Sequence, residues 1–155
     1  MKNKLLIVSR NRESGLIEKK AARNYLVIPQ HKKVYLIIPS DIESDVILSL
    51  CEEISENETG DYVTYIFVKR GSELSETLNS RFPDRKHFRP VVISKIKNMY
   101  VNSADIILTR AGLVSPFDEK IEESAKFGWV TQIASSAKDA ISSALKLLKR
   151  KEKAK

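Results

Sequence analysis

Residues 34–68 read VYLIIPSDIESDVILSLCEEISENETGDYVTYIFV, and this stretch decides the fold class. It begins with an apolar run, residues 34–38, and ends with a second run, 62–68, that is rich in β-branched and aromatic side chains. Such runs are typical of strands that are covered on both faces. Between them, apolar residues recur at helical spacing, namely Ile42, Val46, Ile47, Leu50, Cys51 and Ile54. The stretch therefore predicts a strand–helix–strand unit.

Outward from this unit the same alternation continues. Ser40 and Glu43 have the spacing of a capping box, which predicts the start of the central helix. Further strands are predicted at residues 5–8, 88–94, 105–109 and 129–133, and further helices at 13–24 (Ala21 on its inward face), 71–82, 94–102, 115–128 and from 136. Short loops between alternating elements predict a three-layer α/β/α, Rossmann-like domain with a mainly parallel sheet of about five or six strands.

Length and charge add a domain prediction and a class of partner. A chain of 155 residues predicts one domain, residues 1–150, followed by a disordered basic tail, 151–155. The net charge of +7 is uneven, because residues 1–40 carry nine basic and two acidic side chains, whereas 41–68 carry eight acidic and no basic ones. The basic excess indicates an anionic partner: a phosphate, a membrane surface or a nucleic acid. Nucleic acid is the weaker of these, because no interleaved aromatic pattern accompanies the basic residues.

Several classes of protein are excluded by composition. No apolar run approaches the roughly 18 residues of a membrane span, and residues 1–8 are too short for a secretory signal, so we expect a cytoplasmic protein. The single cysteine, Cys51, lies on the apolar helical stripe and is predicted to be a core residue. His31 and His87 lack ligand spacing and are predicted to lie in exposed turns. We therefore expect neither a metal nor a cofactor.

Candidate binding residues follow the predicted strands, because ligands of parallel sheets bind beyond the carboxyl ends of the strands. Arg110, Gly112 and Ser115 lie between a strand and the helix that begins at Pro116. A glycine lets backbone amides approach a phosphate, a helix start offers free N–H groups, and an arginine adds a bidentate contact. A plain loop glycine and a helix cap explain the same residues equally well, and no P-loop or G-x-G-x-x-G motif is present.

A basic rim is also predicted at the same sheet edge. It comprises Arg10 and Arg12 after the first strand, the turn KRGS at residues 69–72, and Arg110. Basic side chains that follow successive parallel strands converge on one edge, which suits an anionic ligand.

Residues 103–113, SADIILTRAGL, followed by Ser115 and Asp118, carry a family resemblance. They resemble the donor-binding, carboxyl-terminal half of GT-B glycosyltransferases of the lipid-linked N-acetylglucosaminyltransferase type. The resemblance implies that Gly112 and Ser115 lie against the diphosphate of a nucleotide sugar, and that Asp118 binds the ribose hydroxyls of UDP. The family has glutamate at that acidic position, which Glu119 would match in a shifted register.

The resemblance implies a nucleotide-sugar or nucleotide-phosphate binding domain, with a UDP-sugar as substrate. The acceptor half, which supplies the base in that family, has no counterpart in these residues. A glycosyltransferase activity would then require an acceptor-binding partner protein at a membrane surface. The alternative is a non-enzymatic α/β module that binds nucleic acid or protein through its basic surfaces.

Overall fold

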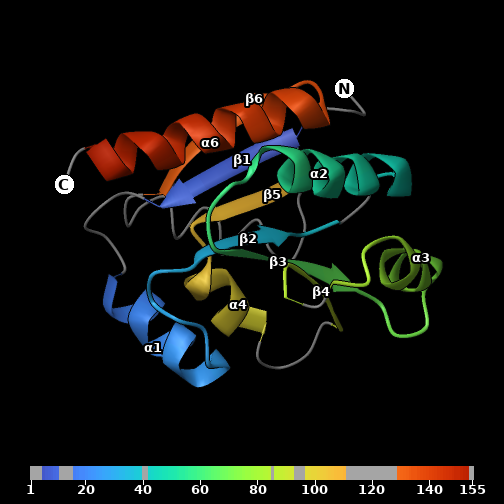
Figure 1. Ribbon diagram of the computed structural model, residues 1–155, viewed down its shortest axis with the longest axis horizontal. Helices are drawn as coiled ribbons and strands as arrows, with labels where there is room; N and C mark the ends of the chain where they lie inside the picture. Colours follow the sequence, from blue (N-terminus) through green and yellow to red (C-terminus); the bar gives the residue numbers. More distant parts are fainter. Residues whose placement is uncertain are drawn as a thin grey trace.

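The structure is a computed structural model that describes residues 5–10, 16–39, 42–84, 86–92, 97–110 and 129–153. Its strands and helices alternate along most of the chain (Figure 1), so the predicted α/β class is confirmed. The strands are β1 (Leu5–Arg10), β2 (Lys33–Ile37), β3 (Tyr62–Val68), β4 (Phe88–Val92), β5 (Ile106–Arg110) and β6 (Trp129–Ala134). The helices are α1 (Leu16–Leu26), α2 (Ser44–Asn57), α3 (Glu73–Arg81), α4 (Lys97–Ser103) and α6 (Ala137–Lys153).

The sheet contains a block of four parallel strands, in the order β4-β3-β2-β5. β1 and β6 extend the sheet beyond β5, and β1 runs antiparallel to both of its neighbours. The predicted sheet is therefore confirmed in part. The direction of β1 cannot be read from the alternation of strands and helices. A parallel β1 would require α1 to carry the chain back across the sheet before β2 begins, and α1 does not do so.

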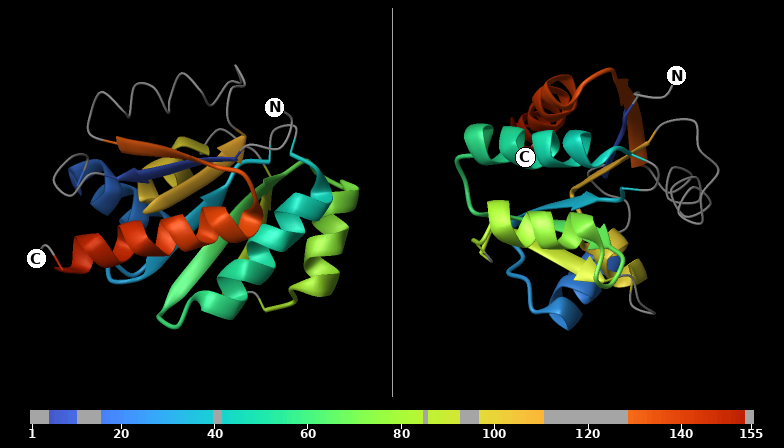
Figure 2. Two further views of the ribbon diagram at one scale, coloured as in Figure 1. Left: turned by 90° about the horizontal axis from the view of Figure 1, so that it is seen from above. Right: turned by 90° about the vertical axis from the view of Figure 1, so that its right-hand side faces the viewer.

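Helices cover both faces of the sheet (Figure 2). Apolar residues of α2, α3 and α6 pack on one face, where Ile47, Leu78 and Ile141 belong to one buried cluster with strand residues. The other face is covered by the end of α1 and by α4, where Ile28 and Val101 belong to a second cluster. Because β2 and β3 lie between these two clusters, all seven residues of β3 are buried.

The helix stripe predicted over residues 42–54 is confirmed, but its start is not. α2 begins at Ser44, and Glu43 is the N-cap residue without a side-chain cap bond. Ser40, the other residue of the predicted capping box, lies outside the described residues. Just before the helix, the Ile42 N–H donates to Pro39 O at 2.7 Å.

Two other helices start close to the predicted residues 71 and 136, and each is capped by a serine. The Ser72 side chain accepts a hydrogen bond from the Ser75 N–H and caps α3. At α6, the Asp139 N–H donates to Ser136 Oγ at 3.1 Å, and the Ser135 N–H donates to Asp139 Oδ2 at 3.3 Å. α6 continues to Lys153, so helix occupies three of the residues for which we expected a disordered tail.

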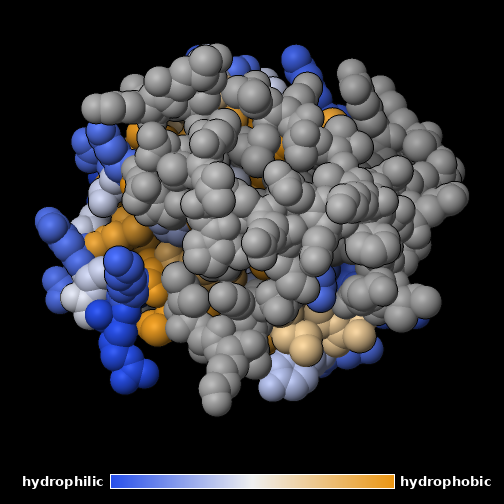
Figure 3. All heavy atoms as spheres, turned by 180° about the vertical axis from the view of Figure 1, so that it is seen from behind, coloured by the Kyte–Doolittle hydropathy of each residue, from blue (hydrophilic) through white to orange (hydrophobic). Residues whose placement is uncertain are grey.

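None of the helices in the described ranges is long and apolar enough to cross a membrane. Among the same residues, the large hydrophobic side chains that are exposed are Tyr25, Val27 and Val92. Seen from behind, hydrophobic side chains lie interspersed with hydrophilic ones at the margin of the molecule (Figure 3).

Val27 ends α1 in a conformation that β-branched residues rarely adopt. Its φ is 58°, in the left-handed region. The Val27 N–H donates to Asn24 O and the Ile28 N–H donates to Arg23 O, which are the two hydrogen bonds of a Schellman motif. The position after such a helix end is usually glycine, because a side chain there costs about 1–2 kcal/mol. The Val27 side chain is 87% exposed, so it regains little by burial.

We therefore expect Val27→Gly to raise the free energy of unfolding by about 1 kcal/mol, since strain is removed and little packing is lost. Urea denaturation followed by circular dichroism measures the change. Val27→Ala is the matched control and should gain less, because alanine keeps a Cβ in the left-handed region. A loss of stability in Val27→Gly would contradict the assignment of strain to this residue.

Candidate functional site

The candidate site lies at the carboxyl ends of β2 and β5. These strands are parallel neighbours, with Ile37 opposite Leu108, and the Ile38 N–H donates to Leu108 O at 2.8 Å just beyond the end of β2. The chain leaves β2 through α2 on one face of the sheet and reaches β5 through α4 on the other. Such a point, where successive connections move to opposite faces, is where open α/β sheets usually bind their ligands.

Arg110 is the predicted site residue that belongs to a described element, since it is the last residue of β5. The register places Arg110 opposite Leu5, at the carboxyl edge of the parallel block. Gly112, Ser115 and Asp118 lie outside the described residues, so their predicted roles stay predictions.

The turn at residues 69–72 follows β3, the other neighbour of β2, and contributes positive charge to the same edge. Lys69 and Arg70 are both exposed, and neither forms an ion pair within the described part of the chain. Gly71 has a φ of 68°, and no atom lies within 4 Å of the position that a Cβ would take. A glycine is therefore required here by the backbone, not by a crowded neighbour.

Arg10 does not belong to this rim, contrary to the prediction. Because β1 runs antiparallel, Arg10 pairs with Trp129 at the amino edge of the sheet, whereas Leu5 lies beside Arg110. Arg12 lies outside the described residues. The basic rim that the described residues support comprises Lys69, Arg70 and Arg110.

Cys51 is a core residue, as predicted. It is completely buried on α2, and burial raises the pKa of its thiol to about 12. A thiol with such a pKa is protonated at neutral pH, so Cys51 is not a nucleophile.

The two histidines occupy different environments. His31 is exposed, as predicted, and its Nε2 lies 3.0 Å from Asp61 Oδ2. His87 is half-buried rather than exposed, because its ring stacks on Tyr62 at 4.4 Å between centroids while Nδ1 lies 2.6 Å from Asp84 Oδ2. Among the described residues, no group of three or more histidine, cysteine or acidic side chains could hold a metal.

A buried charge network at the amino edge has no local signal in the sequence. Arg23 of α1 is completely buried, whereas the predicted inward residue Ala21 is exposed. The Arg23 guanidinium donates to Asp105 Oδ2 at 2.8 Å and to three backbone carbonyls, those of Ser103, Gln30 and Lys32. Every nitrogen of the guanidinium therefore has an acceptor, which offsets the cost of its burial.

Asp105 receives hydrogen bonds and charge from three directions. Lys19 Nζ lies 2.6 Å from Oδ1, while Arg23 and the Val34 N–H both donate to Oδ2. Burial by itself raises the pKa of a carboxyl, but Lys19, Arg23 and the Val34 N–H together hold the pKa of Asp105 below its ordinary value. Asp105 is therefore a charged structural residue.

A second carboxylate at this edge, Glu58, is also fully engaged. The Tyr35 hydroxyl donates to Oε2 at 2.5 Å, while Lys33 Nζ and the Gly60 N–H lie 3.0 and 3.1 Å from Oε1. Against the effect of burial, these partners lower the pKa of Glu58, and burial together with Glu58 raises the pKa of Tyr35. Neither Asp105 nor Glu58 is free to act as a general acid or base at neutral pH.

No protein-family model, curated protein or solved structure matches this chain.

Asp105→Asn should lower the free energy of unfolding by about 3 kcal/mol at neutral pH, because it leaves the Arg23 guanidinium buried without a counter-charge. In the wild type the pKa of Asp105 is lowered by folding, so its stabilisation is present above about pH 4 and is lost as the pH falls through the lowered pKa. Urea denaturation at neutral pH and near pH 3 measures both effects.

Asp84→Asn is the control, because Asp84 is an exposed carboxylate whose pKa is also lowered, chiefly by its hydrogen bond with His87. It should change stability much less than Asp105→Asn. Equal effects of the two substitutions, or an unchanged pH slope in Asp105→Asn, would contradict the structural role of Asp105.

Proposed function

We propose that the chain is a nucleotide-phosphate binding domain whose ligand occupies the crevice beyond β2 and β5. The observation that carries this proposal is the topology, because the parallel order β4-β3-β2-β5 changes face between β2 and β5. In open α/β sheets, a nucleotide is bound where the connections diverge. That the fold is Rossmann-like is part of the same proposal.

The charge at this edge supports a phosphate as the part of the ligand that is bound there. Lys69 and Arg70 follow β3, and Arg110 ends β5, so basic residues flank β2 on both sides. Arginine binds phosphate in a bidentate manner and lysine adds a compact positive charge. A neutral ligand would leave these charges without a counterpart.

A nucleotide sugar is the specific ligand that we propose, on the resemblance to the donor-binding half of GT-B glycosyltransferases. In this proposal Gly112 and Ser115 contact the diphosphate, Arg110 adds positive charge, and Asp118 binds the ribose. Sugar transfer requires a partner that supplies the acceptor site and the base. Asp105 and Glu58 do not take the place of that base, because both lie at the opposite edge and are paired.

Titration calorimetry with UDP and UDP-N-acetylglucosamine tests the proposal. Arg110→Ala should weaken UDP binding about 10-fold or more, because a charge-assisted hydrogen bond to phosphate is lost. Arg10→Ala is the matched control, since it removes the same charge from the same sheet at the opposite edge and should leave the affinity unchanged. Absence of UDP binding at millimolar concentration would refute the proposal.

If Arg10→Ala and Arg110→Ala weaken binding equally, the affinity comes from the general positive charge. That result would favour the alternative of a module that binds polyanions, whose affinity should fall steeply with salt.

Asp118 separates a nucleotide site from a simple phosphate site. Asp118→Ala should weaken UDP binding about 10-fold through loss of the ribose contacts, while leaving the affinity for inorganic diphosphate unchanged or higher. The same titrations measure both ligands, and Glu119→Ala serves as the neighbouring control. If Glu119→Ala loses affinity for UDP and Asp118→Ala does not, Glu119 is the residue that contacts the ribose. An equal loss for UDP and diphosphate in Asp118→Ala would contradict a role at the ribose.

A further inference from the structure

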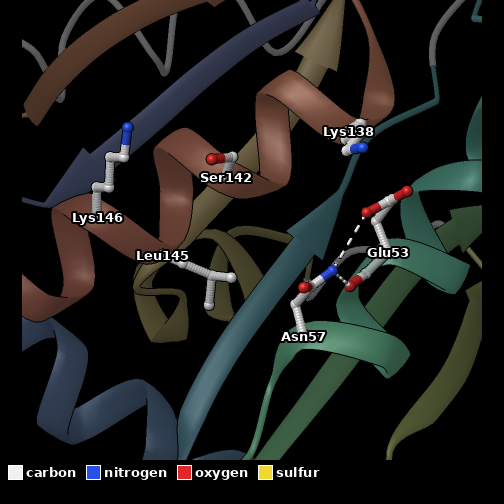
Figure 4. A pocket seen from close by; sticks show the side chains of 6 residues that line it. All are labelled: Glu53, Asn57, Lys138, Ser142, Leu145 and Lys146. Carbon is white, nitrogen blue, oxygen red and sulfur yellow. Dashed lines mark hydrogen bonds between the residues drawn. The ribbon is translucent and has the colours of Figure 1, made fainter.

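The helices α2 and α6, which cover one face of the sheet, have a groove between them. The proposed ligand site lies elsewhere, at the carboxyl edge of the sheet. The groove has a volume of about 260 Å³ and is lined by Glu53, Asn57, Lys138, Ser142, Leu145 and Lys146 (Figure 4). The two helices pack side by side over the same apolar cluster. The groove is therefore a fixed feature of the helical layer.

The two walls of the groove carry opposite charge. α2 contains four acidic residues and no basic one, namely Asp45, Glu52, Glu53 and Glu56. α6 contains six basic and two acidic residues. Lys138, Ser142 and Lys146 are spaced by four residues, so they form one stripe along α6. Glu53 lines the groove on α2, and Lys138 and Lys146 line it on α6, whereas Glu52 pairs with Arg81 of α3.

These walls do not neutralise each other within the described part of the chain. No ion pair joins α2 to α6 there, and Lys138, Lys146 and Glu56 are exposed. The Glu53 carboxylate instead accepts a hydrogen bond from Asn57 of its own helix, at 3.2 Å. Opposite charges that stay unpaired within one molecule are available to another molecule.

We propose that this face is where a second copy of the chain docks, with a two-fold axis along the groove. Such an axis sets the acidic α2 of each copy against the basic α6 of the other, so that both contacts are attractive. A nucleic acid or an anionic membrane would meet the acidic α2, and a basic partner would meet α6. A second copy offers both charges in the required order.

The size of the face limits the area that the dimer can bury. Helices of 14 and 17 residues, lying side by side, present a layer about 20 Å long and 20 Å wide, or about 400 Å² per copy. The total of about 800 Å² is below the roughly 1,200–2,000 Å² of stable specific interfaces, so the dimer is weak, reversible and sensitive to salt.

Charge exchange tests this interface by sedimentation velocity at about 100 μM protein, in low salt and in about 0.5 M salt. The wild type should be dimeric in low salt and shift toward monomer in high salt. Lys138→Glu with Lys146→Glu makes both walls acidic, and Glu53→Lys with Glu56→Lys makes both walls basic. Each double variant alone should be monomeric, and an equimolar mixture of the two should restore a dimer.

The matched controls change the net charge by the same amount elsewhere. Lys69→Glu with Arg70→Glu, and Glu73→Lys with Glu76→Lys on α3, should both remain dimeric. Circular dichroism establishes that every variant is folded. The interface is overturned by a monomeric wild type in low salt, by dimers in either groove variant alone, or by folded groove variants whose mixture stays monomeric.

Discussion

The contact between Asp105 and Val34 sets the register on which the rest of the sheet depends. The Asp105 N–H donates to Val34 O at 2.8 Å, and the Val34 N–H donates to Asp105 Oδ2 at 2.9 Å. One residue thus joins the starts of β5 and β2 through both its backbone and its side chain. Because strands are stiff, fixing their amino ends also fixes which residues emerge together at their carboxyl ends. Arg110 reaches the carboxyl edge next to β2 for this reason.

The same carboxylate explains the direction of β1. Asp105 holds Arg23, which also binds the carbonyls of Gln30 and Lys32 just before β2. α1 is thereby anchored beside the amino ends of β2 and β5. The helix does not recross the sheet, so the strand before it must end at the amino edge, and β1 is antiparallel to β5. A buried ion pair contributes modestly to stability compared with apolar packing, but here it specifies the path of the chain.

Local features of this fold could be predicted from the sequence, and features that depend on distant residues could not. The stripe of α2, the caps at Ser72 and Ser136, and the burial of Cys51 depend on neighbours within one or two turns. The burial of Arg23 could not be predicted, because its acceptor Asp105 is 82 residues away in the sequence. An arginine in a helix with no evident partner is expected to face solvent. Arg10 was placed at the wrong edge because strand direction is a property of the whole sheet. For the candidate site, the residue types that follow each strand could be predicted from the sequence. Which strands are neighbours in the sheet could not.

The distribution of paired and unpaired charge says more about binding than the net charge of +7. At the amino edge, Asp105 forms ion pairs with Arg23 and Lys19, and Glu58 forms one with Lys33. Lys69 and Arg70 at the carboxyl edge, and Lys138 and Lys146 on α6, form no ion pair within the described ranges. The two groups of cations have different surroundings. Those at the carboxyl edge surround a strand end, whereas those on α6 lie beside the acidic α2. A small anion suits the first group, while a surface that carries both charges suits the second.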